Sequence, residues 1–168
     1  VDSKKNLETL IKEIEDVVKN SFKEAYDEID KNFNYMCKEI LNNSIGNLSL
    51  LDETDLLESG VELMVKFKNK KYQSLSLLSG GEKSMVAVAL IMAIFMYKPS
   101  PFTFFDEIEA ALDESNTKRL LRKLKEFTDR SQFILITHNK HTMKESDQLY
   151  GVTMNKEIGE SKILSVVL

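Results

Sequence analysis

The first forty residues contain neither glycine nor proline, so nothing in them interrupts a helix. Apolar residues recur along this stretch at steps of mostly three and four, at Leu7, Ile11, Ile14, Val18, Phe22, Tyr26, Ile29, Phe33, Met36 and Ile40. This spacing predicts one helix with a single apolar stripe, and the Glu and Lys on its other faces indicate that those faces are solvated. At 1.5 Å per residue such a helix is about 60 Å long, which is more than a small domain needs.

Two interpretations of this helix stay open. Its length and its mostly heptad spacing favour the base of a coiled-coil arm, in which the steps of four from Ile14 to Tyr26 locally stretch the repeat. The alternative is an amphipathic helix that lies along its own domain. The residues Asn42, Asn43, Ser44 and Gly46 end the helix with turn chemistry, so a different structure is expected to begin there.

The rest of the chain alternates strand and helix patterns. Leu48 and Leu50, and then Val61 to Phe67, alternate with polar residues and predict two strands around the loop 52–60. From Leu75 on we predict helix 79–97, strand 102–106, helix 114–127, strand 132–137, helix 140–145, strand 148–154 and strand 162–167. This rhythm predicts an α/β fold with a mainly parallel sheet flanked by helices.

Composition excludes several classes of protein. The net charge of -4 and the pI near 5.4 argue against a free-standing basic DNA-binding module. The cluster Lys66, Lys68, Lys70 and Lys71 is either a solvated hairpin tip or a local DNA contact. Cys37 is the only cysteine, so an intramolecular disulfide and a multi-cysteine metal site are impossible, and we interpret it as a half-buried helix residue. No signal peptide is recognisable and the longest apolar run, 85–97, is too short to cross a bilayer, which predicts a cytoplasmic protein without membrane contact.

Polar residues end two of the predicted apolar strands. The strand before Asp106 and Glu107 and the strand before Thr137 and His138 both end in this way, and ligands of open α/β sheets bind at the carboxyl ends of strands. An acidic pair at such a place is the Walker B arrangement of nucleotide hydrolases, in which the first carboxylate serves Mg²⁺ and the second orients or deprotonates water. An exposed acidic turn is the alternative.

The segment Leu78 to Glu82 opens the longest apolar helix of the predicted domain. Its two glycines, Gly80 and Gly81, would let backbone N–H groups approach a phosphate at the helix N-terminus. Ser79 and Glu82 also fit a capping box, and the two roles do not exclude each other. None of the 6 glycines precedes a lysine, so the phosphate-binding pattern G-x-x-x-x-G-K-[ST] does not occur in these 168 residues. Either the chain is part of a split enzyme or it is a binding module with inactive motifs.

Together these segments resemble the ABC-type ATPase heads of SMC (structural maintenance of chromosomes) proteins. The resemblance lies in Leu78 to Glu82 for the signature motif, Phe102 to Glu107 for Walker B, Ala110 to Asp113 for the D-loop, and Thr137-His138 for the switch histidine. Further likeness in 75–82, 99–113 and 132–154 points to the bacterial chromosomal SMC proteins and extends over residues 46–168. The sequence departs from that pattern at Asn139, where bacterial relatives usually have Arg, and at 67–69, where a proline-rich turn is usual.

The resemblance implies a fold, cofactors and residue roles. It implies that residues 46–168 are the C-terminal lobe of an ABC-type ATPase head, a P-loop NTPase-like sheet flanked by helices, and that residues 1–45 are the base of the C-terminal coiled-coil arm. The N-terminal end of the parent protein would supply Walker A. The cofactors would be ATP and Mg²⁺. By position, Ser79, Gly80 and Gly81 would contact ATP held by a second head, Asp106 would serve Mg²⁺, Glu107 would polarise water, Asp113 would communicate across the dimer and His138 would contact the γ-phosphate.

The resemblance also implies partners and a biological role. The partners would be the N-terminal head lobe of the same protein, a second SMC head in an ATP-dependent homodimer, the winged-helix domain of a kleisin subunit, and DNA through the complete complex at the nucleoid. Ile163 and Val166 are candidate kleisin contacts, although a core strand is the simpler interpretation of them. ATP hydrolysis would drive chromosome condensation and segregation through DNA entrapment or loop extrusion. The alternatives are a split-head DNA-repair ATPase of the Rad50 or RecN kind and a kleisin-binding platform without activity, while an ABC transporter subunit would carry Walker A in one continuous domain.

Overall fold

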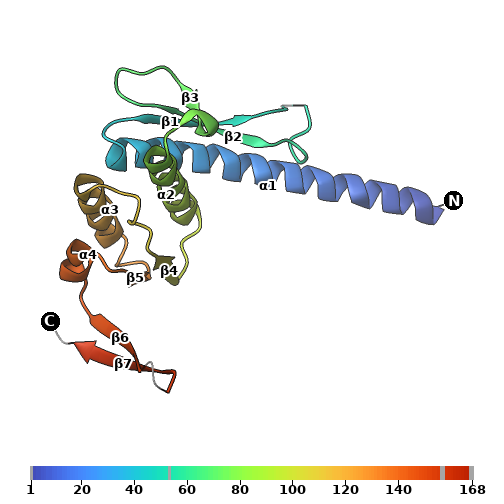
Figure 1. Cartoon of the computed structure of the whole chain (residues 1–168). Helices are drawn as coiled ribbons and strands as arrows, with labels where there is room; N and C mark the ends of the chain where they lie inside the picture. The colour runs from blue at the N-terminus through green and yellow to red at the C-terminus, as the bar shows by residue number, and fades with distance from the viewer. Residues whose placement is uncertain (1, 53, 156–157, 167–168) are drawn as a thin grey trace.

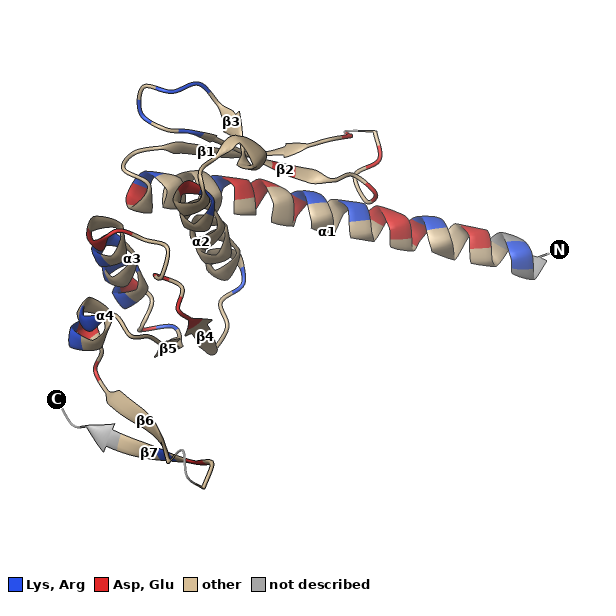
Figure 2. Ribbon diagram, in the orientation of Figure 1, with Lys and Arg blue, Asp and Glu red and all other residues tan. Residues whose placement is uncertain are grey.

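The computed structural model describes residues 2–52, 54–155 and 158–166, and one long helix dominates its shape (Figure 1). This helix, α1 (Asp2–Ile40), confirms the prediction of a single uninterrupted helix. Acidic and basic residues both recur along most of its length (Figure 2). Strand β1 (Ile45–Leu50) and helices α2 (Gly80–Tyr97) and α3 (Glu114–Glu126) pack against α1, and α2 and α3 lie near its C-terminal end (Figure 1).

The two halves of α1 have different surroundings. In the C-terminal half Phe33, Met36 and Ile40 belong to the main buried cluster of the protein. In the N-terminal half every large apolar side chain from residue 7 to residue 18 is between 44% and 64% exposed, namely Leu7, Leu10, Ile11, Ile14, Val17 and Val18. The exposed N-terminal half therefore fits the interpretation as a coiled-coil arm. The buried C-terminal half fits the interpretation as an amphipathic helix that lies along its own domain. The domain boundary at residue 45 stays a prediction, but the core runs continuously across it.

The helix α1 is held against a small antiparallel sheet. Strands β1 (Ile45–Leu50), β2 (Val61–Lys66) and β3 (Gln73–Ser74) lie in that order, and the first two are the strands predicted around the loop 52–60. Side chains of α1 complete the outer edge of β1. Tyr26 donates from its hydroxyl to the carbonyl of Leu48 over 2.7 Å, and the N–H of Leu48 donates to Asp30 over 2.5 Å.

Close approach of β1 to α1 requires a glycine and buries the cysteine. A Cβ at Gly46 would lie 2.5 Å from Cys37 Sγ and 2.8 Å from the Phe33 ring, so any side chain there would push the strand away. Cys37 is fully buried, and the prediction that it is half-buried was wrong because β1 covers it. Burial raises the pKa of the Cys37 thiol to about 12, which leaves it protonated and chemically inert at neutral pH.

The remaining chain alternates helices and strands close to the predicted bounds. After the short 3₁₀ turn Leu75–Leu77 come α2 (Gly80–Tyr97), β4 (Phe102–Asp106), α3 (Glu114–Glu126), β5 (Gln132–Ile136) and α4 (Lys140–Glu145). The chain ends in the hairpin of β6 (Leu149–Asn155) and β7 (Glu160–Val166), which extends away from the other elements (Figure 1).

The prediction of a mainly parallel sheet was wrong for the part of the chain that the structure describes. There, β4 and β5 form the only parallel pair, while β1–β2–β3 and β6–β7 are separate antiparallel sheets. The strand–helix–strand rhythm is present, but the strands do not meet in one sheet. As a result the β4–β5 pair leaves apolar side chains uncovered, with Phe104 63% and Ile136 57% exposed.

The helix α2 forms the centre of the core. Among the described helices, α2 is the one that is long and apolar enough to span a membrane. The core helix of a globular protein often meets the same two criteria. Helix α2 buries Val86, Ala89 and Met92 in the same cluster as α1, and near its C-terminus the Phe95 ring lies 5.5 Å from Phe127 and 5.4 Å from Phe133. Its other face is open, because Ile91 and Ile94 are exposed.

The C-terminal hairpin is also apolar and uncovered. Val152 and Ile163 face each other across β6 and β7, and each is 72% exposed. The interpretation of Ile163 as a core-strand residue was therefore wrong in this chain, because nothing in the described structure covers that face of the hairpin. The side chain of Val166 lies outside the described residues.

A buried lysine joins α1 to α3. Only 3% of the Lys123 side chain is exposed, and its ammonium lies 2.6 Å from Glu126, 3.0 Å from Glu39 and 2.9 Å from the Tyr35 hydroxyl. Burial acts to lower the pKa of Lys123, but its hydrogen bonds to Glu126, Tyr35 and Glu39 outweigh that effect and raise it. The lysine thus stays charged and ties the two helices together.

We predict that Lys123→Met lowers the free energy of unfolding by about 2 kcal/mol, because the mutation removes charge-assisted hydrogen bonds and leaves Glu39 and Glu126 without their partner. Urea unfolding of the purified protein measures this difference. Lys118→Met is the matched control, since it removes an exposed pair with Glu114 on the same helix and should change stability by less than about 0.5 kcal/mol. Equal effects of the two mutations would contradict the structural role of Lys123.

Candidate functional site

Ser79 caps α2 as the sequence predicts. Its hydroxyl accepts from the N–H of Glu82, and the Glu82 carboxylate in turn accepts from the N–H of Ser79 over 3.0 Å and from its hydroxyl over 2.9 Å. The second carboxylate oxygen of Glu82 lies 2.9 Å from the ammonium of Lys70. The capping box is therefore confirmed, and it fixes the backbone on which Gly80 and Gly81 stand.

Lys70 and Ser79 change the acidity of Glu82. The hydrogen bond from Lys70, followed by those from the N–H and the hydroxyl of Ser79, lowers the pKa of the Glu82 carboxyl to about 2. Lys70 comes from the loop between β2 and β3, as do Lys68 and Lys71 of the predicted cluster, while Lys66 ends β2. Figure 2 shows blue segments along this loop. One member of that cluster thus has a structural partner, and the choice between a solvated tip and a DNA contact stays open for the others.

The two glycines differ in their surroundings. A Cβ at Gly80 would meet nothing within 4 Å, so the helix N-terminus is open to the outside at this point. A Cβ at Gly81 would lie 3.5 Å from the carbonyl oxygen of Ala111, which places the start of α2 beside the segment 110–113. The start of α2 and the segment 110–113 together line a pocket of about 340 Å³. Its lining includes Gly81, Glu82, Ala111, Asp113 and Asn42.

Asp113 has a local task at this pocket. It caps α3, because one carboxylate oxygen accepts from the N–H of Asn116 over 2.8 Å and the other from the Asn116 side-chain amide over 3.0 Å. The predicted role in communication across a dimer is not tested by this geometry. The cap lies at the end of the segment 110–113, which passes next to Gly81.

The acidic pair and the histidine meet at the ends of the two parallel strands. Asp106 ends β4 and pairs with Ile136, the last residue of β5. Glu107 follows with φ of 45°, an uncommon left-handed conformation for a residue with a side chain, and its N–H donates to the Ile136 carbonyl over 2.9 Å. This turn brings Glu107 Oε1 to 3.2 Å from His138 Nδ1, and 54% of the Glu107 side chain and 77% of the His138 side chain are exposed.

The predicted site residues thus fall into two groups. Ser79, Gly80, Gly81 and Asp113 line one region, and Asp106, Glu107 and His138 line another. Among the described residues no hydrogen bond or ion pair joins a residue of one group to a residue of the other. The segment 107–113 is the covalent link between them.

The donor set of the second group fits a magnesium ion that is bound mainly by phosphate. In the described part of the chain no cluster of three or more His, Cys, Asp or Glu is arranged to hold a metal by itself. Asp106 is an exposed carboxylate, and carboxylate oxygen is the ligand that Mg²⁺ prefers. Mg²⁺ in phosphoryl-transfer sites is typically held by one or two carboxylates together with substrate phosphates and waters, so a single aspartate is compatible with this cofactor.

Sequence reasoning assigned no role to three residues behind this group, Glu109, Thr137 and Thr142. Glu109 is buried, and its Oε1 accepts hydrogen bonds from the hydroxyls of Thr137 and Thr142. In the sequence Glu109 reads as one more acid in an exposed acidic turn, and no apolar periodicity marks a turn residue as buried. Only the folding of α4 against this turn reveals it.

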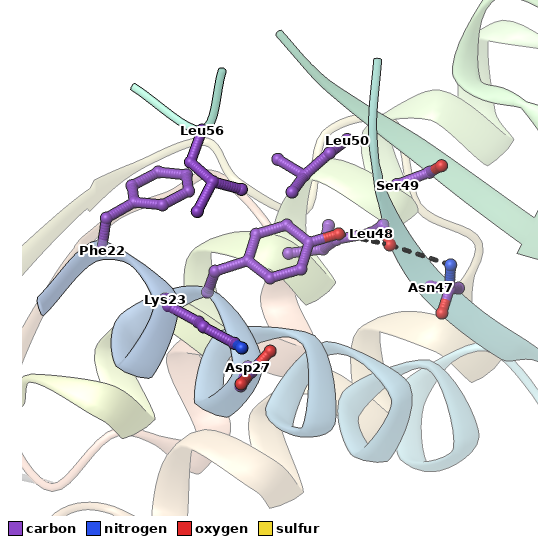
Figure 3. Close-up of a pocket in the computed structure, with 9 residues that line it drawn as sticks. Phe22, Lys23, Asp27, Asn47, Leu48, Ser49, Leu50 and Leu56 are labelled. Carbon is purple, nitrogen blue, oxygen red and sulfur yellow. Dashed lines mark hydrogen bonds between the residues drawn. The ribbon is translucent and has the colours of Figure 1, made fainter. Parts of the chain in front are cut away.

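A larger pocket lies away from both groups. It has a volume of about 470 Å³ and is formed by α1, β1 and Leu56 of the loop 52–60. In Figure 3, Phe22, Leu50 and Leu56 form an apolar wall, and Lys23 and Asp27 project from α1 at the opposite side. No predicted site residue lines this pocket.

Comparison with known proteins assigns the chain to a family. The family model described as RecF/RecN/SMC N terminal domain matches residues 4–160, which is nearly the whole chain. The chain belongs to the RecF/RecN/SMC family. The chromosome partition protein Smc of Fusobacterium nucleatum subsp. nucleatum is 64% identical over 165 residues, which is 98% of this chain and 14% of that protein. The chain therefore spans about one seventh of the length of this curated relative.

Solved structures of RecF/RecN/SMC relatives share the fold. The Smc head domain of Pyrococcus furiosus with an extended coiled coil, bound to the C-terminal domain of ScpA, is 35% identical with a TM-score of 0.85, over 97% of this chain and 40% of that one. A structure determined for a study of ATP-driven dimerization and DNA-stimulated activation of SMC ATPases is 34% identical with a TM-score of 0.80, over 88% of this chain and 89% of that one. The mixed α/β architecture is therefore that of an SMC head region.

We predict that Glu82→Gln destabilises the protein at neutral pH and that the difference from the wild type disappears in acid. The pKa of Glu82 is lowered in the folded state, so the charged form stabilises the fold above the unfolded-state pKa near 4.5, and this contribution is lost as the pH falls from there toward 2. Thermal unfolding of both proteins between pH 7 and pH 2 measures the effect. Glu58→Gln, in the exposed loop 52–60, controls for the loss of one carboxylate, and a Glu82→Gln deficit that is constant with pH would contradict the assignment.

Proposed function

We propose that this chain is the C-terminal lobe of an SMC ATPase head, which binds and hydrolyses ATP together with a lobe that carries Walker A. The observation that carries the proposal is the contact of Glu107 with His138, at 3.2 Å, beyond the carboxyl ends of two neighbouring parallel strands. This is the place where ligands bind in open α/β sheets, and both side chains are exposed toward it. The family assignment supports the same chemistry.

The choice of lobe rests on the order of motifs in the sequence. The family description names an N terminal domain, whereas this sequence contains the signature segment, the acidic pair and the histidine, in that order, and no G-x-x-x-x-G-K-[ST] pattern. In a head assembled from both ends of a long chain, those motifs belong to the C-terminal end. Under this proposal residues 46–168 are the lobe and residues 1–45 are the base of the returning arm.

Uncovered apolar surfaces support a second lobe. One side of the β4–β5 pair and the open face of α2 are apolar and exposed, including Phe102, Phe104, Ile91 and Ile94. Exposed apolar area of this extent marks an interaction surface in a soluble protein. A lobe that adds strands beside β4 and β5 would cover these side chains and complete the sheet that the sequence predicts.

The exposed stripe on α1 supports the coiled-coil arm. Leu7, Ile11, Ile14 and Val18 follow heptad spacing and project into solvent, which is the arrangement that a second helix covers in a coiled coil. The Pyrococcus furiosus relative is an Smc head with an extended coiled coil, and it matches 97% of this chain. We infer that the partner helix comes from the other end of the same protein.

The proposed residue roles follow from the two groups. Ser79, Gly80 and Gly81 present the open N-terminus of α2, where backbone N–H groups and the helix dipole favour phosphate, so they would contact ATP held by a second head. Asp106 would hold Mg²⁺, which neutralises charge on phosphate oxygens when bound. Glu107 would orient or deprotonate the attacking water, His138 would contact the γ-phosphate, and Asp113 would face the dimer interface beside Gly81.

Partners and location are proposed on the same basis. One solved relative belongs to a study of ATP-driven dimerization and DNA-stimulated activation of SMC ATPases, and another is bound to ScpA. We infer that this chain likewise acts in an ATP-dependent homodimer with a kleisin winged-helix domain, and that the complete complex binds DNA at the nucleoid in the cytoplasm. Its function would be chromosome condensation and segregation by DNA entrapment or loop extrusion.

We predict that the chain alone has no magnesium-dependent ATPase activity and that activity appears on mixing it with a chain that carries the Walker A lobe of its parent protein. The rate should rise steeply with concentration, because two assembled heads must meet. A coupled ATPase assay on the separate and mixed chains measures this.

The variant Ser79→Arg is the control for this mixing experiment. It should leave ATP binding by one assembled head intact and block dimers of heads, which sedimentation in the presence of ATP detects. Turnover by the chain alone would refute the split site. Assembly of the two lobes without turnover would favour the kleisin platform without activity.

We predict that Glu107→Gln slows hydrolysis by about a hundredfold or more in the assembled head while ATP-dependent dimers persist, because loss of a general base typically costs this much. Steady-state ATPase rates and sedimentation with ATP measure the two quantities. Glu24→Gln, on the exposed surface of α1, should leave both unchanged. A wild-type rate in Glu107→Gln would assign the base to another residue.

A further inference from the structure

Glu109 is buried although it has an acidic side chain. It is 5% exposed, and among the described residues it is the only acidic side chain in the buried class. A carboxylate is expensive to bury unless hydrogen bonds replace its lost water. In this protein the hydroxyls of Thr137 and Thr142 both donate to its Oε1, the latter over 2.8 Å, and Thr142 is itself fully buried on α4.

The direction of these hydrogen bonds fixes the loop that carries His138. The Thr137 hydroxyl donates its hydrogen bond to Oε1 of Glu109. The same hydroxyl oxygen then accepts from the N–H of Asn139 over 2.9 Å. His138 lies between Thr137 and Asn139, so the backbone on both sides of the histidine is held by one hydroxyl whose orientation Glu109 determines.

The tie through Glu109 runs beside the contact of Glu107 with His138. Both glutamates belong to the same turn, in which the N–H of Ala110 donates to the carbonyl of Glu107 and the N–H of Leu112 to that of Glu109, each over 2.9 Å. The contact of Glu107 with His138 is solvent-exposed, and solvent-exposed polar contacts contribute little to the stability of a structure. The buried hydrogen bonds of Glu109 are therefore the contacts that can fix the position of His138 relative to Glu107.

We propose that Glu109 is a positioning residue, which sets His138 against Glu107 through Thr137 and Thr142. This inference rests on the proposed ATPase function for its kinetic consequences. Glu109 does not touch the reacting groups itself. It also stands four residues before Asp113, the cap of α3, so the same turn that orients His138 continues into the segment beside the signature glycines.

The test compares Glu109 variants in the assembled head. Misplacement of catalytic groups by about an ångström costs on the order of a hundredfold in rate. We therefore expect Glu109→Ala to lower kcat by roughly ten- to a hundredfold and to leave the KM for ATP within about twofold, because under the proposed function Walker A of the other lobe would supply most of the binding energy for the nucleotide. Glu109→Gln keeps the shape of the side chain and one acceptor oxygen, so it should show a smaller loss of kcat than Glu109→Ala. It also provides the test if Glu109→Ala does not fold.

A double-mutant cycle separates positioning from a general structural role. If Glu109 acts through His138, Glu109→Gln should cost much less in a His138→Ala background than in the wild type, whereas independent effects would multiply. Glu145→Gln is the matched control, since it removes a carboxylate from an exposed pair with Lys125 of α3 and should leave kcat unchanged. Glu145 ends α4, the helix that also carries Thr142. Multiplying effects, a raised KM with unchanged kcat, or wild-type kinetics in both Glu109 variants would each overturn the proposal.

A spectroscopic readout makes the inference independent of turnover. The imidazole nitrogen resonances of His138 in the assembled head report its contact with Glu107, and they should shift in Glu109→Gln and stay unchanged in Glu145→Gln. If the wild-type head does not hydrolyse ATP, the proposed function fails while this measurement still decides the role of Glu109. Unchanged His138 resonances in Glu109→Gln would overturn the inference even in an active head.

Discussion

The packing of α2 against the C-terminal half of α1 is the interaction on which the rest of the structure depends. Phe33, Met36 and Ile40 from α1 and Val86 and Met92 from α2 belong to one buried cluster. Because α2 begins at the signature glycines and leads at its other end into β4, its position determines where both groups of site residues lie. Burial of these apolar side chains, at about 25 cal/mol per Å² of area removed from water, is the main force that holds that position.

Ion pairs and hydrogen bonds, some buried and some partly exposed, then fix the positions of the segments around α1 and α2. Lys123 joins α3 to α1, Glu82 joins the signature segment to the β2–β3 loop through Lys70, and Glu109 joins the turn after β4 to the loop of His138. Each tie links segments that are distant in sequence. Such contacts contribute modestly to the free energy of unfolding, but they restrict how the linked segments can be placed. A buried polar group that loses its partner is costly, so few other placements of the segments are possible.

Much of the fold and of the site follows from local sequence patterns. The apolar spacing of residues 7 to 40 predicts α1, and the capping pattern of Ser79 and Glu82 predicts the start of α2. These predictions succeed because each depends on the period of a helix or strand or on chemistry within one turn. The burial of Cys37 and Glu109 depends on β1 and α4 packing over them, and no local pattern encodes that.

The sequence by itself determined which segments are helices and strands, where the capping box of α2 lies, and that the pattern G-x-x-x-x-G-K-[ST] does not occur in these 168 residues. Only the tertiary structure decided that the strands form separate small sheets, that the site residues fall into two groups, and that Glu109 lies behind His138. The physical reason is that local patterns report the backbone's own hydrogen bonding and amphipathicity. Strand pairing and the burial of single polar side chains depend instead on contacts between segments far apart in the chain.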